Sequence, residues 1–420
     1  MLIEFKDVAR QKMTATRKRY FGRIPDVFTK MYQFTRAKTA RALGYYPYFP
    51  NIEKSDATEV TIDNEKKIML GSNNYLGLGT HPKVVEAGIK ALKDYGSGLT
   101  GSRFLNGNIA LHLELEEKLA KFVGKEKALV FSSGFGVNLG VIHAIAKQND
   151  YVFSDEFNHA SIVDGIRFAG AIKRKIKHND MRDLEYHLAS AGHHGARFIV
   201  TDGVFSMEGD IANLKGIADL AHKYHARVMV DDAHSIGVLG PIGNGTAAHF
   251  GITDKVDLIM GTFSKSFGSL GGFIAGDDPI IDYLKHHTRT MIFTAALPPT
   301  NVASTMAALE IMESEPDRRT KVLENSVYMR NNLKDMGYNV GETVTPIIPI
   351  IIGKDVKTFY MWKDLLAAGV YTNPIVSPAT PPGRALLRTS YMATHTREQL
   401  DFCLEMFDKI GHQRRVLTKS

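Results

Sequence analysis

The chain has 420 residues, of which 44% are hydrophobic and 23% are charged, a balance typical of a globular protein with an ample core. Its one cysteine, Cys403, excludes an internal disulfide and a cysteine-based zinc site, and it fits a reducing compartment. The first residues lack a cationic start followed by an apolar stretch, so we expect a cytoplasmic protein without a signal peptide. The most apolar window, 345–353, is too short to span a membrane.

The net charge of +7 is concentrated in a basic arm near the N-terminus. Residues 10–41 contain ten basic residues against one acidic residue, Asp26. The basic residues are Arg10, Lys12, Arg17, Lys18, Arg19, Arg23, Lys30, Arg36, Lys38 and Arg41. Such an arm could face nucleic acid, an anionic membrane surface or the phosphates of a large ligand. It could equally be a solvated amphipathic helix whose apolar side is Met13, Tyr20, Phe28, Met31 and Phe34.

Helical and strand-like segments alternate from about residue 60. Apolar residues at helical spacing predict helices over 81–96, 112–124 and 214–225. Short apolar runs predict strands at 127–134, 151–156, 196–204, 226–234 and 256–265. This alternation indicates an α/β fold with a mostly parallel sheet that is covered by helices on both faces.

The C-terminal part predicts a smaller α+β domain. A helical stretch over 302–336 leads to the apolar run at 345–353 and to a last helix near 396–411. We therefore expect an N-terminal arm over 1–60, a large domain over 61–295 and a small domain over 296–420.

Polar side chains follow the predicted strands of the large domain. They are Ser132 and Ser133, Asp155 with His159, Asp202 with Ser206, Asp231 with His234, and Lys265. Because ligands of such sheets bind beyond the carboxyl ends of the strands, these side chains are expected to converge on one crevice.

Two other kinds of site are poorly supported by the sequence. The segment GSGLTG, 96–101, matches the glycine pattern of dinucleotide-binding folds, but a helix precedes it and a loop follows, so it predicts only a flexible loop. Asp231, Asp232 and His234 could in principle hold a metal, yet they lack a fourth ligand, so we expect no metal.

The segment GTFSKSFGSLGGF, 261–273, places a lysine beside hydroxyls and glycines at a strand end. A pyridoxal phosphate site needs a lysine to form an imine and a carboxylate to keep the ring nitrogen protonated. Lys265 and Asp231 fit these two needs, although Asp231 could instead cap the turn that follows it.

The same cofactor needs hydroxyls and free N–H groups around its phosphate. Thr262 and Ser264 offer hydroxyls, and the segment 133–135 opens a helix whose N-terminus favours an anion. His159 and His234 could stack on the ring or donate to it.

Six segments of the chain resemble the α-oxoamine synthases, which are fold-type I pyridoxal phosphate enzymes. The segments, in family order, are SNNYLGL (72–78), SSGFGVN (132–138), DEFNHASIVDG (155–165), TDGVFSMEGD (201–210), VDDAHSIGVLG (230–240) and GTFSKSFGSLGG (261–272). The resemblance runs from about residue 45 to 411 and implies a homodimer whose sites lie at the subunit interface.

The resemblance also implies roles for single residues. Lys265 would hold the cofactor as an imine, Asp231 would pair with the ring nitrogen, His159 would stack on the ring, and His234 would lie by the phenolic oxygen with Ser206 nearby. The expected phosphate ligands are Ser133, Gly134, Phe135, Thr262 and Ser264, with Thr294 from the other subunit. The expected substrate contacts are Asn74, Ser102 and Arg388.

Within the family, TGSRFLNGN (100–108), KSFGSLGGF and PATPPGRALLR (378–388) resemble the bacterial serine palmitoyltransferases. This resemblance implies the condensation of L-serine with palmitoyl-CoA to 3-ketosphinganine, with release of CoA and carbon dioxide. The alternatives are 8-amino-7-oxononanoate synthase and glycine C-acetyltransferase. One departure concerns an arginine of the bacterial enzymes, because Val376 or Ser377 stands in its place, and Arg384 is the candidate substitute.

Two readings outside this chemistry are disfavoured. A non-catalytic scaffold subunit would have lost the lysine, but Lys265 is present. A nucleic-acid binder would interleave aromatic and basic residues. In the arm, only Tyr20 and Phe21 follow a run of basic residues, at 17–19. We therefore expect no nucleic acid as partner, and a peripheral contact of the arm with an anionic inner membrane remains open.

Overall fold

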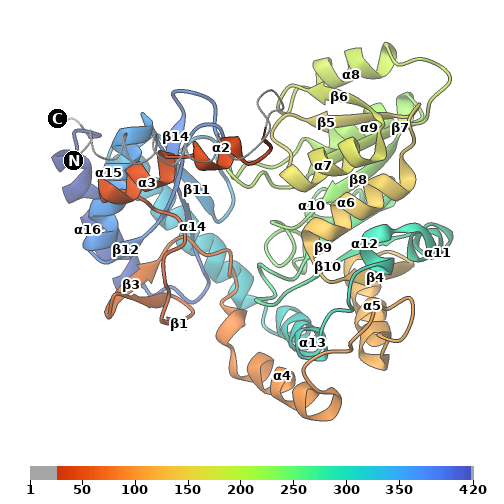
Figure 1. Cartoon of the computed structure of the whole chain (residues 1–420), viewed down its shortest axis with the longest axis horizontal. Helices are drawn as coiled ribbons and strands as arrows, with labels where there is room; N and C mark the ends of the chain where they lie inside the picture. Colours follow the sequence, from red (N-terminus) through yellow and green to blue (C-terminus); the bar gives the residue numbers. More distant parts are fainter. Residues whose placement is uncertain (1–25, 418–420) are drawn as a thin grey trace. The chain divides into compact units, whose positions relative to one another are not determined.

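The computed structural model describes residues 26–417, and the chain divides into two compact units, Met1–Pro50 and Asn51–Ser420 (Figure 1). The first unit contains the short helices α2 (Thr29–Tyr32) and α3 (Arg36–Ala42). Six of the ten basic residues of the arm, together with Met13 and Tyr20, lie outside the described residues. The partner of the arm therefore stays a prediction.

The second unit is built on a seven-stranded sheet with the order β4-β10-β9-β8-β7-β5-β6. Its strands are β4 (Lys127–Phe131), β5 (Tyr151–Asp155), β6 (Ile172–Ile176), β7 (Arg197–Asp202), β8 (Arg227–Asp231), β9 (Leu258–Thr262) and β10 (Gly272–Gly276). Strand β10 runs antiparallel to both β4 and β9, whereas the pairs of β5 with β6 and β7, of β7 with β8 and of β8 with β9 are parallel. The predicted mostly parallel sheet is confirmed.

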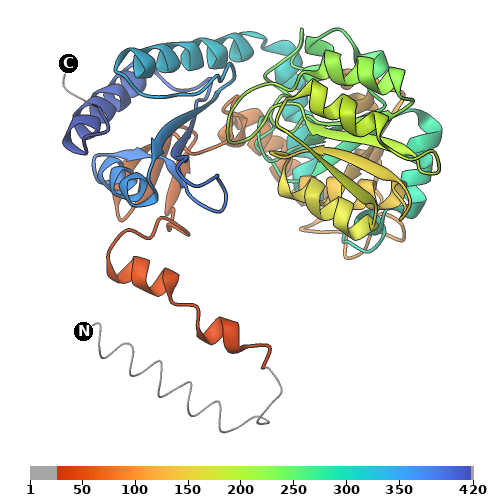
Figure 2. The same cartoon turned by 90° about the horizontal axis from the view of Figure 1, so that it is seen from above.

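Helices cover both faces of this sheet because alternate strand residues point to opposite sides. In β4, Ala128 and Val130 join one apolar cluster, while Leu129 and Phe131 join the other. The first face packs against α4 (Pro82–Tyr95), α5 (Ala110–Val123), α8 (Met181–Ala189), α9 (Leu214–Lys223) and α13 (Pro299–Ser314). The second face packs against α6 (Gly134–Ile145), α7 (Ala160–Ala169), α11 (Asp278–His287) and α12 (Arg289–Ile292). Figure 2 shows these helices around the strands.

Short elements complete this part of the chain. They are the 3-10 turns η1 (Leu78–Thr80) and η2 (Thr253–Lys255) and the helix α10 (Thr246–His249).

The C-terminal part forms a second apolar core around an antiparallel sheet with the order β11-β14-β13. Its elements are α14 (Asp317–Asp335), β11 (Ile347–Gly353), α15 (Asp355–Ala367), β13 (Asn373–Ile375), β14 (Ala385–Ser390) and α16 (Arg397–Gln413). A further sheet joins β1 (Lys54–Asp56), β2 (Glu59–Ile62) and β3 (Glu65–Met69) to β12 (Val370–Tyr371).

The helical stretch expected over 302–336 is two helices, α13 and α14, rather than one. The break falls at Pro316, which has no backbone N–H to continue the first helix. Helix α13 packs with the large sheet through Val302, Ala308 and Leu309. The domain boundary expected at 295/296 stays a prediction, and this packing favours a boundary nearer Pro316.

Candidate active site

The carboxyl ends of the parallel strands bring polar residues together as the sequence predicts. Lys265 follows β9. Its side chain interacts electrostatically with Asp231 at the end of β8 and with Asp202 at the end of β7. None of the hydrogen bonds or ion pairs within residues 26–417 involves its ammonium group. Desolvation lowers the pKa of Lys265 to about 8, and the two carboxylates offset only part of that effect. A lysine of this kind exchanges a proton near neutral pH.

Asp231 is buried and held by two donors. Its Oδ2 atom accepts a hydrogen bond from Asn138 Nδ2 at 2.6 Å, and its Oδ1 atom accepts one from Ala233 N at 3.0 Å. The second contact is the turn-capping role that the sequence left open for Asp231, so the residue caps the turn and still presents a fixed carboxylate to the crevice. Asn138 comes from the second turn of α6 and also donates to Ser161 Oγ at 2.9 Å.

Asp202 is a second buried carboxyl group in the crevice. Burial and the neighbouring charge of Asp231 raise the pKa of Asp202 well above its usual range. Asp202 accepts a hydrogen bond from the backbone N–H of His159 at 3.2 Å. Because two adjacent buried carboxyls avoid carrying two charges, this shift favours the neutral form of Asp202.

His159 and His234 both favour the neutral imidazole. Partial burial lowers the pKa of His159, which caps α7 and contacts Ser161 Oγ through Nδ1 at 2.6 Å. Desolvation and the positive charges of Lys265 and Arg388 lower the pKa of His234 well below its ordinary value. The ring edge of Phe135 lies beside His159, with centroids 6.3 Å apart.

Tyr75 sets the orientation of His234. Its hydroxyl lies 2.7 Å from His234 Nδ1 and 3.3 Å from Asn73 Oδ1. Burial raises the pKa of Tyr75 to about 12, so the hydroxyl keeps its proton. The short contact with Nδ1 holds the imidazole ring of His234 in one orientation.

A cradle for a phosphate lies where α6 begins. Ser133 caps the helix by accepting a hydrogen bond from Gly136 N at 3.0 Å, and the hydroxyls of Thr262 and Ser264 lie 3.0 Å apart. A Cβ atom added to Gly134 would stand 2.7 Å from Thr262 Oγ1, so only glycine leaves this space open. The donors and the space fit the phosphate of pyridoxal phosphate.

We expect Gly134→Ala to weaken the binding of pyridoxal phosphate by about tenfold, because the added methyl group crowds the Thr262 hydroxyl. Titration of the apoprotein with the cofactor, followed by absorbance, measures this effect. Gly98→Ala is the control, since a Cβ atom at Gly98 meets nothing within 4 Å. Equal affinities of the Gly134 variant and the wild type would show that the phosphate lies elsewhere.

Arg388 on β14 reaches the crevice from the C-terminal sheet. It is 5% exposed, and it donates from Nε to the Ser206 carbonyl oxygen at 2.6 Å and from Nη2 to Asn73 Oδ1 at 2.9 Å. Asn74 accepts a hydrogen bond from Gly79 N at 3.3 Å, and its expected contact with the substrate stays a prediction. Asn73 is therefore the neighbour of Arg388.

Three further residues were expected to bind the cofactor or the substrate. Thr294 is exposed, and its expected contact with the cofactor of another subunit stays a prediction. The Ser102 hydroxyl is buried and has no hydrogen-bond partner within residues 26–417. Arg384, the candidate for the missing arginine, is exposed.

Sequence reasoning missed Asn73, Tyr75 and Asn138 as parts of the crevice, and it placed Asp202 there without giving it a role. Asn73 and Tyr75 lie in SNNYLGL, Asn138 closes SSGFGVN one turn after Gly134, and Asp202 stands at a strand end. The segments carried the signal, but their pairing with Arg388, His234 and Asp231 depends on tertiary contacts.

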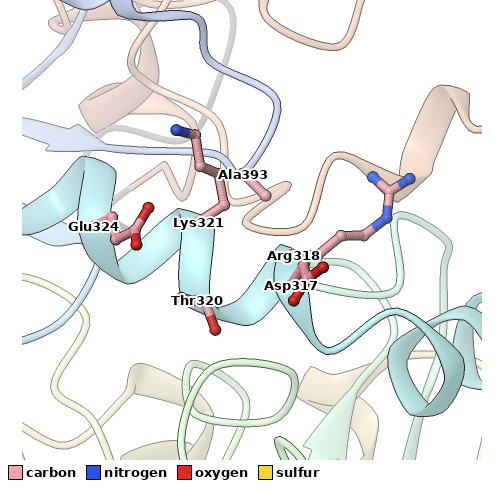
Figure 3. Close-up of a pocket in the computed structure, with 6 residues that line it drawn as sticks. All are labelled: Asp317, Arg318, Thr320, Lys321, Glu324 and Ala393. Carbon is pink, nitrogen blue, oxygen red and sulfur yellow. The ribbon is translucent and has the colours of Figure 1, made fainter.

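A surface pocket elsewhere is a weaker candidate for the active site than this crevice. It is lined by Ala393 and by residues of α14, namely Asp317, Arg318, Thr320, Lys321 and Glu324 (Figure 3). Its acidic and basic side chains balance, and none of the residues expected to bind the cofactor lines it. Within residues 26–417 no cluster of three or more histidine, cysteine or acidic residues could hold a metal.

These features define a pyridoxal phosphate-dependent enzyme of fold type I. The model of the family "aminotransferase class I and II" matches residues 65–407. A serine palmitoyltransferase of Sphingobacterium spiritivorum is 49% identical over 91% of this chain and 96% of its own length. A protein of Acetivibrio thermocellus named putative 8-amino-7-oxononanoate synthase is 44% identical over 92% of this chain and its full length.

A solved structure shows the same fold with the cofactor present. The serine palmitoyltransferase from S. paucimobilis, with a bound aldimine of pyridoxal phosphate and myriocin, superposes with a TM-score of 0.91. It is 36% identical and covers 94% of this chain and 100% of its own. The chain belongs to the aminotransferase class I and II family, and it is a pyridoxal phosphate-dependent acyltransferase of the α-oxoamine synthase class.

Proposed function

We propose that the protein condenses L-serine with a long-chain acyl-CoA, palmitoyl-CoA in the first place, to 3-ketosphinganine with loss of carbon dioxide. The observation that carries this proposal is the 49% identity, over nearly the whole chain, to a relative named serine palmitoyltransferase. The 44% identity to a relative named putative 8-amino-7-oxononanoate synthase makes the alanine and pimeloyl-CoA reaction the second candidate.

The side chains of the crevice have separate roles in this proposal. Bound pyridoxal phosphate supplies an electron sink for the negative charge that develops at the α-carbon of the amino acid. Asp231 would hold a proton on the ring nitrogen, and His159 would cover the ring face. The Lys265 amine, with its pKa lowered to about 8, accepts the α-proton and returns it later. Arg388 binds the carboxylate of the amino acid as a buried cation.

We further propose that the working form is a homodimer. The exposed Thr294 would then complete the phosphate cradle of the other subunit. Within residues 26–417 no helix is both long enough and apolar enough to cross a membrane. Contact of the basic arm with an anionic membrane stays a separate prediction.

A panel of substrates tests the proposed reaction. Serine, alanine and glycine are each assayed with palmitoyl-, pimeloyl- and acetyl-CoA, and free CoA release is measured. We expect serine with palmitoyl-CoA to have the highest kcat/KM, by at least about tenfold, because a site that hydrogen-bonds the serine hydroxyl discriminates against alanine. Turnover of alanine with pimeloyl-CoA, and none of serine, would instead establish the second candidate.

A further inference from the structure

The loop over 203–211, between β7 and α9, links the large sheet to Arg388. The Ser206 carbonyl oxygen in this loop accepts the Arg388 Nε–H at 2.6 Å. The Gly209 carbonyl oxygen accepts hydrogen bonds from the hydroxyls of Thr343 at 3.1 Å and Thr345 at 2.8 Å. The loop therefore supplies one of the two acceptors that orient the Arg388 guanidinium, and Asn73 Oδ1 is the other.

His178 binds the C-terminal end of the loop through Asp210. Its Nδ1 atom lies 3.1 Å from Asp155 Oδ1, and its Nε2 atom lies 2.9 Å from Asp210 Oδ2. The ring packs between Phe157 and Phe205, with centroid distances of 4.5 Å to each. Two carboxylates and two aromatic rings thus hold one histidine, and one member of each pair, Asp210 and Phe205, belongs to the loop.

The histidine carries a positive charge at neutral pH. Burial alone would lower its pKa, but the hydrogen bonds and charges of Asp155 and Asp210 outweigh burial and raise the pKa of His178 to about 10. Two further acidic residues lie near it, each with a basic neighbour. Glu208 lies in the loop and interacts electrostatically with Arg384, and Glu156 accepts the His178 backbone N–H at 3.3 Å and pairs with Lys175 at 3.1 Å. Removal of the cation would leave acidic groups facing one another across a partly buried gap.

We propose that His178 is a positioning residue that fixes the loop over 203–211 through Asp210, so that the Ser206 carbonyl oxygen aims Arg388 at the carboxylate of the amino acid. The residue has no contact with the substrate. The inference rests on the role proposed above for Arg388, and it makes His178 a determinant of amino-acid affinity.

The test compares amino-acid binding by holoenzyme carrying His178→Ala with that of the wild type. The probe is the amino acid of the panel that the wild type turns over best, and binding is followed by the change in cofactor absorbance. We expect the affinity to fall by about tenfold, whereas the KM for the acyl-CoA stays the same. His194→Ala, at an exposed histidine, should leave both values unchanged.

A thermal unfolding curve for each variant separates positioning from stability. A lower melting temperature with an unchanged amino-acid affinity would overturn the proposal, and so would unchanged values of both. If the wild type bound no amino acid of the panel, the proposed reaction would fail with it.

A second set of variants keeps the proposal testable if His178→Ala does not fold. Asp210→Asn keeps the shape of its side chain and removes one charge of the pair. It should weaken amino-acid binding several-fold, and adding His178→Gln should weaken it little further, because both changes break the same link. Additive losses in the double variant, or full affinity in Asp210→Asn, would contradict the proposed link.

Discussion

Replacement of Lys265 by alanine should lower kcat by about a thousandfold or more, because the variant lacks the base that exchanges the α-proton. The visible absorbance that the cofactor gains on covalent attachment should be lost as well. Turnover and the absorption spectrum of purified holoenzyme measure the two effects.

Lys265→Arg is the matched variant, since arginine keeps the positive charge but does not release its proton near neutral pH. We expect it to bind the cofactor and yet to be as inactive as Lys265→Ala. Activity within tenfold of the wild type in either variant would place the base elsewhere.

Replacement of Asp231 by asparagine should lower kcat by about a hundredfold or more, because an amide cannot hold the proton on the ring nitrogen by charge. Asparagine has a single side-chain acceptor, so it keeps only one of the hydrogen bonds from Asn138 Nδ2 and Ala233 N. The variant therefore removes the negative charge together with one acceptor at nearly the same shape. The kinetic constants and the cofactor spectrum of the variant, at full cofactor occupancy, measure the effect.

Asp232 provides the control for Asp231. It is fully buried, but its carboxylate caps local backbone and side-chain donors, Ser235 Oγ at 2.5 Å and Thr246 N at 2.9 Å. Asp232→Asn should lower the melting temperature and leave kcat within a few-fold of the wild type. If the two neighbouring substitutions lowered kcat equally, the special role of Asp231 would be refuted.

The sequence predicted the large sheet well because buried parallel strands are continuous apolar runs. All five strands expected there are present, each shortened at one or both ends. Strands β6 and β10 were not expected, since IKRKI alternates apolar with basic residues and GFIAG follows a glycine-rich loop. The sequence predicts one continuous helical stretch over 302–336, but Pro316 divides it into α13 and α14.

The crevice was predicted in outline but not in its pairings. Strand ends mark Asp231, His234 and Lys265, because each interrupts or follows an apolar run. The partners that orient them, such as Tyr75 for His234 and Asn138 for Asp231, lie far away along the chain. Polar residues in loops and on helices have no period that reveals such contacts.

For the same reason, the sequence could not show which of Asn73 and Asn74 contacts Arg388. Neighbouring asparagines in one loop are indistinguishable by pattern, and only the backbone decides which side chain turns to Arg388. His178 is a further case, since the two aspartates that bind it come from separate segments.

Borohydride reduction of the holoenzyme, followed by proteolysis and mass spectrometry, tests the central claim most directly. The account predicts that the reduced cofactor is attached to one peptide and that the modified residue is Lys265. Attachment at another lysine, or no attached cofactor at all, would contradict the account.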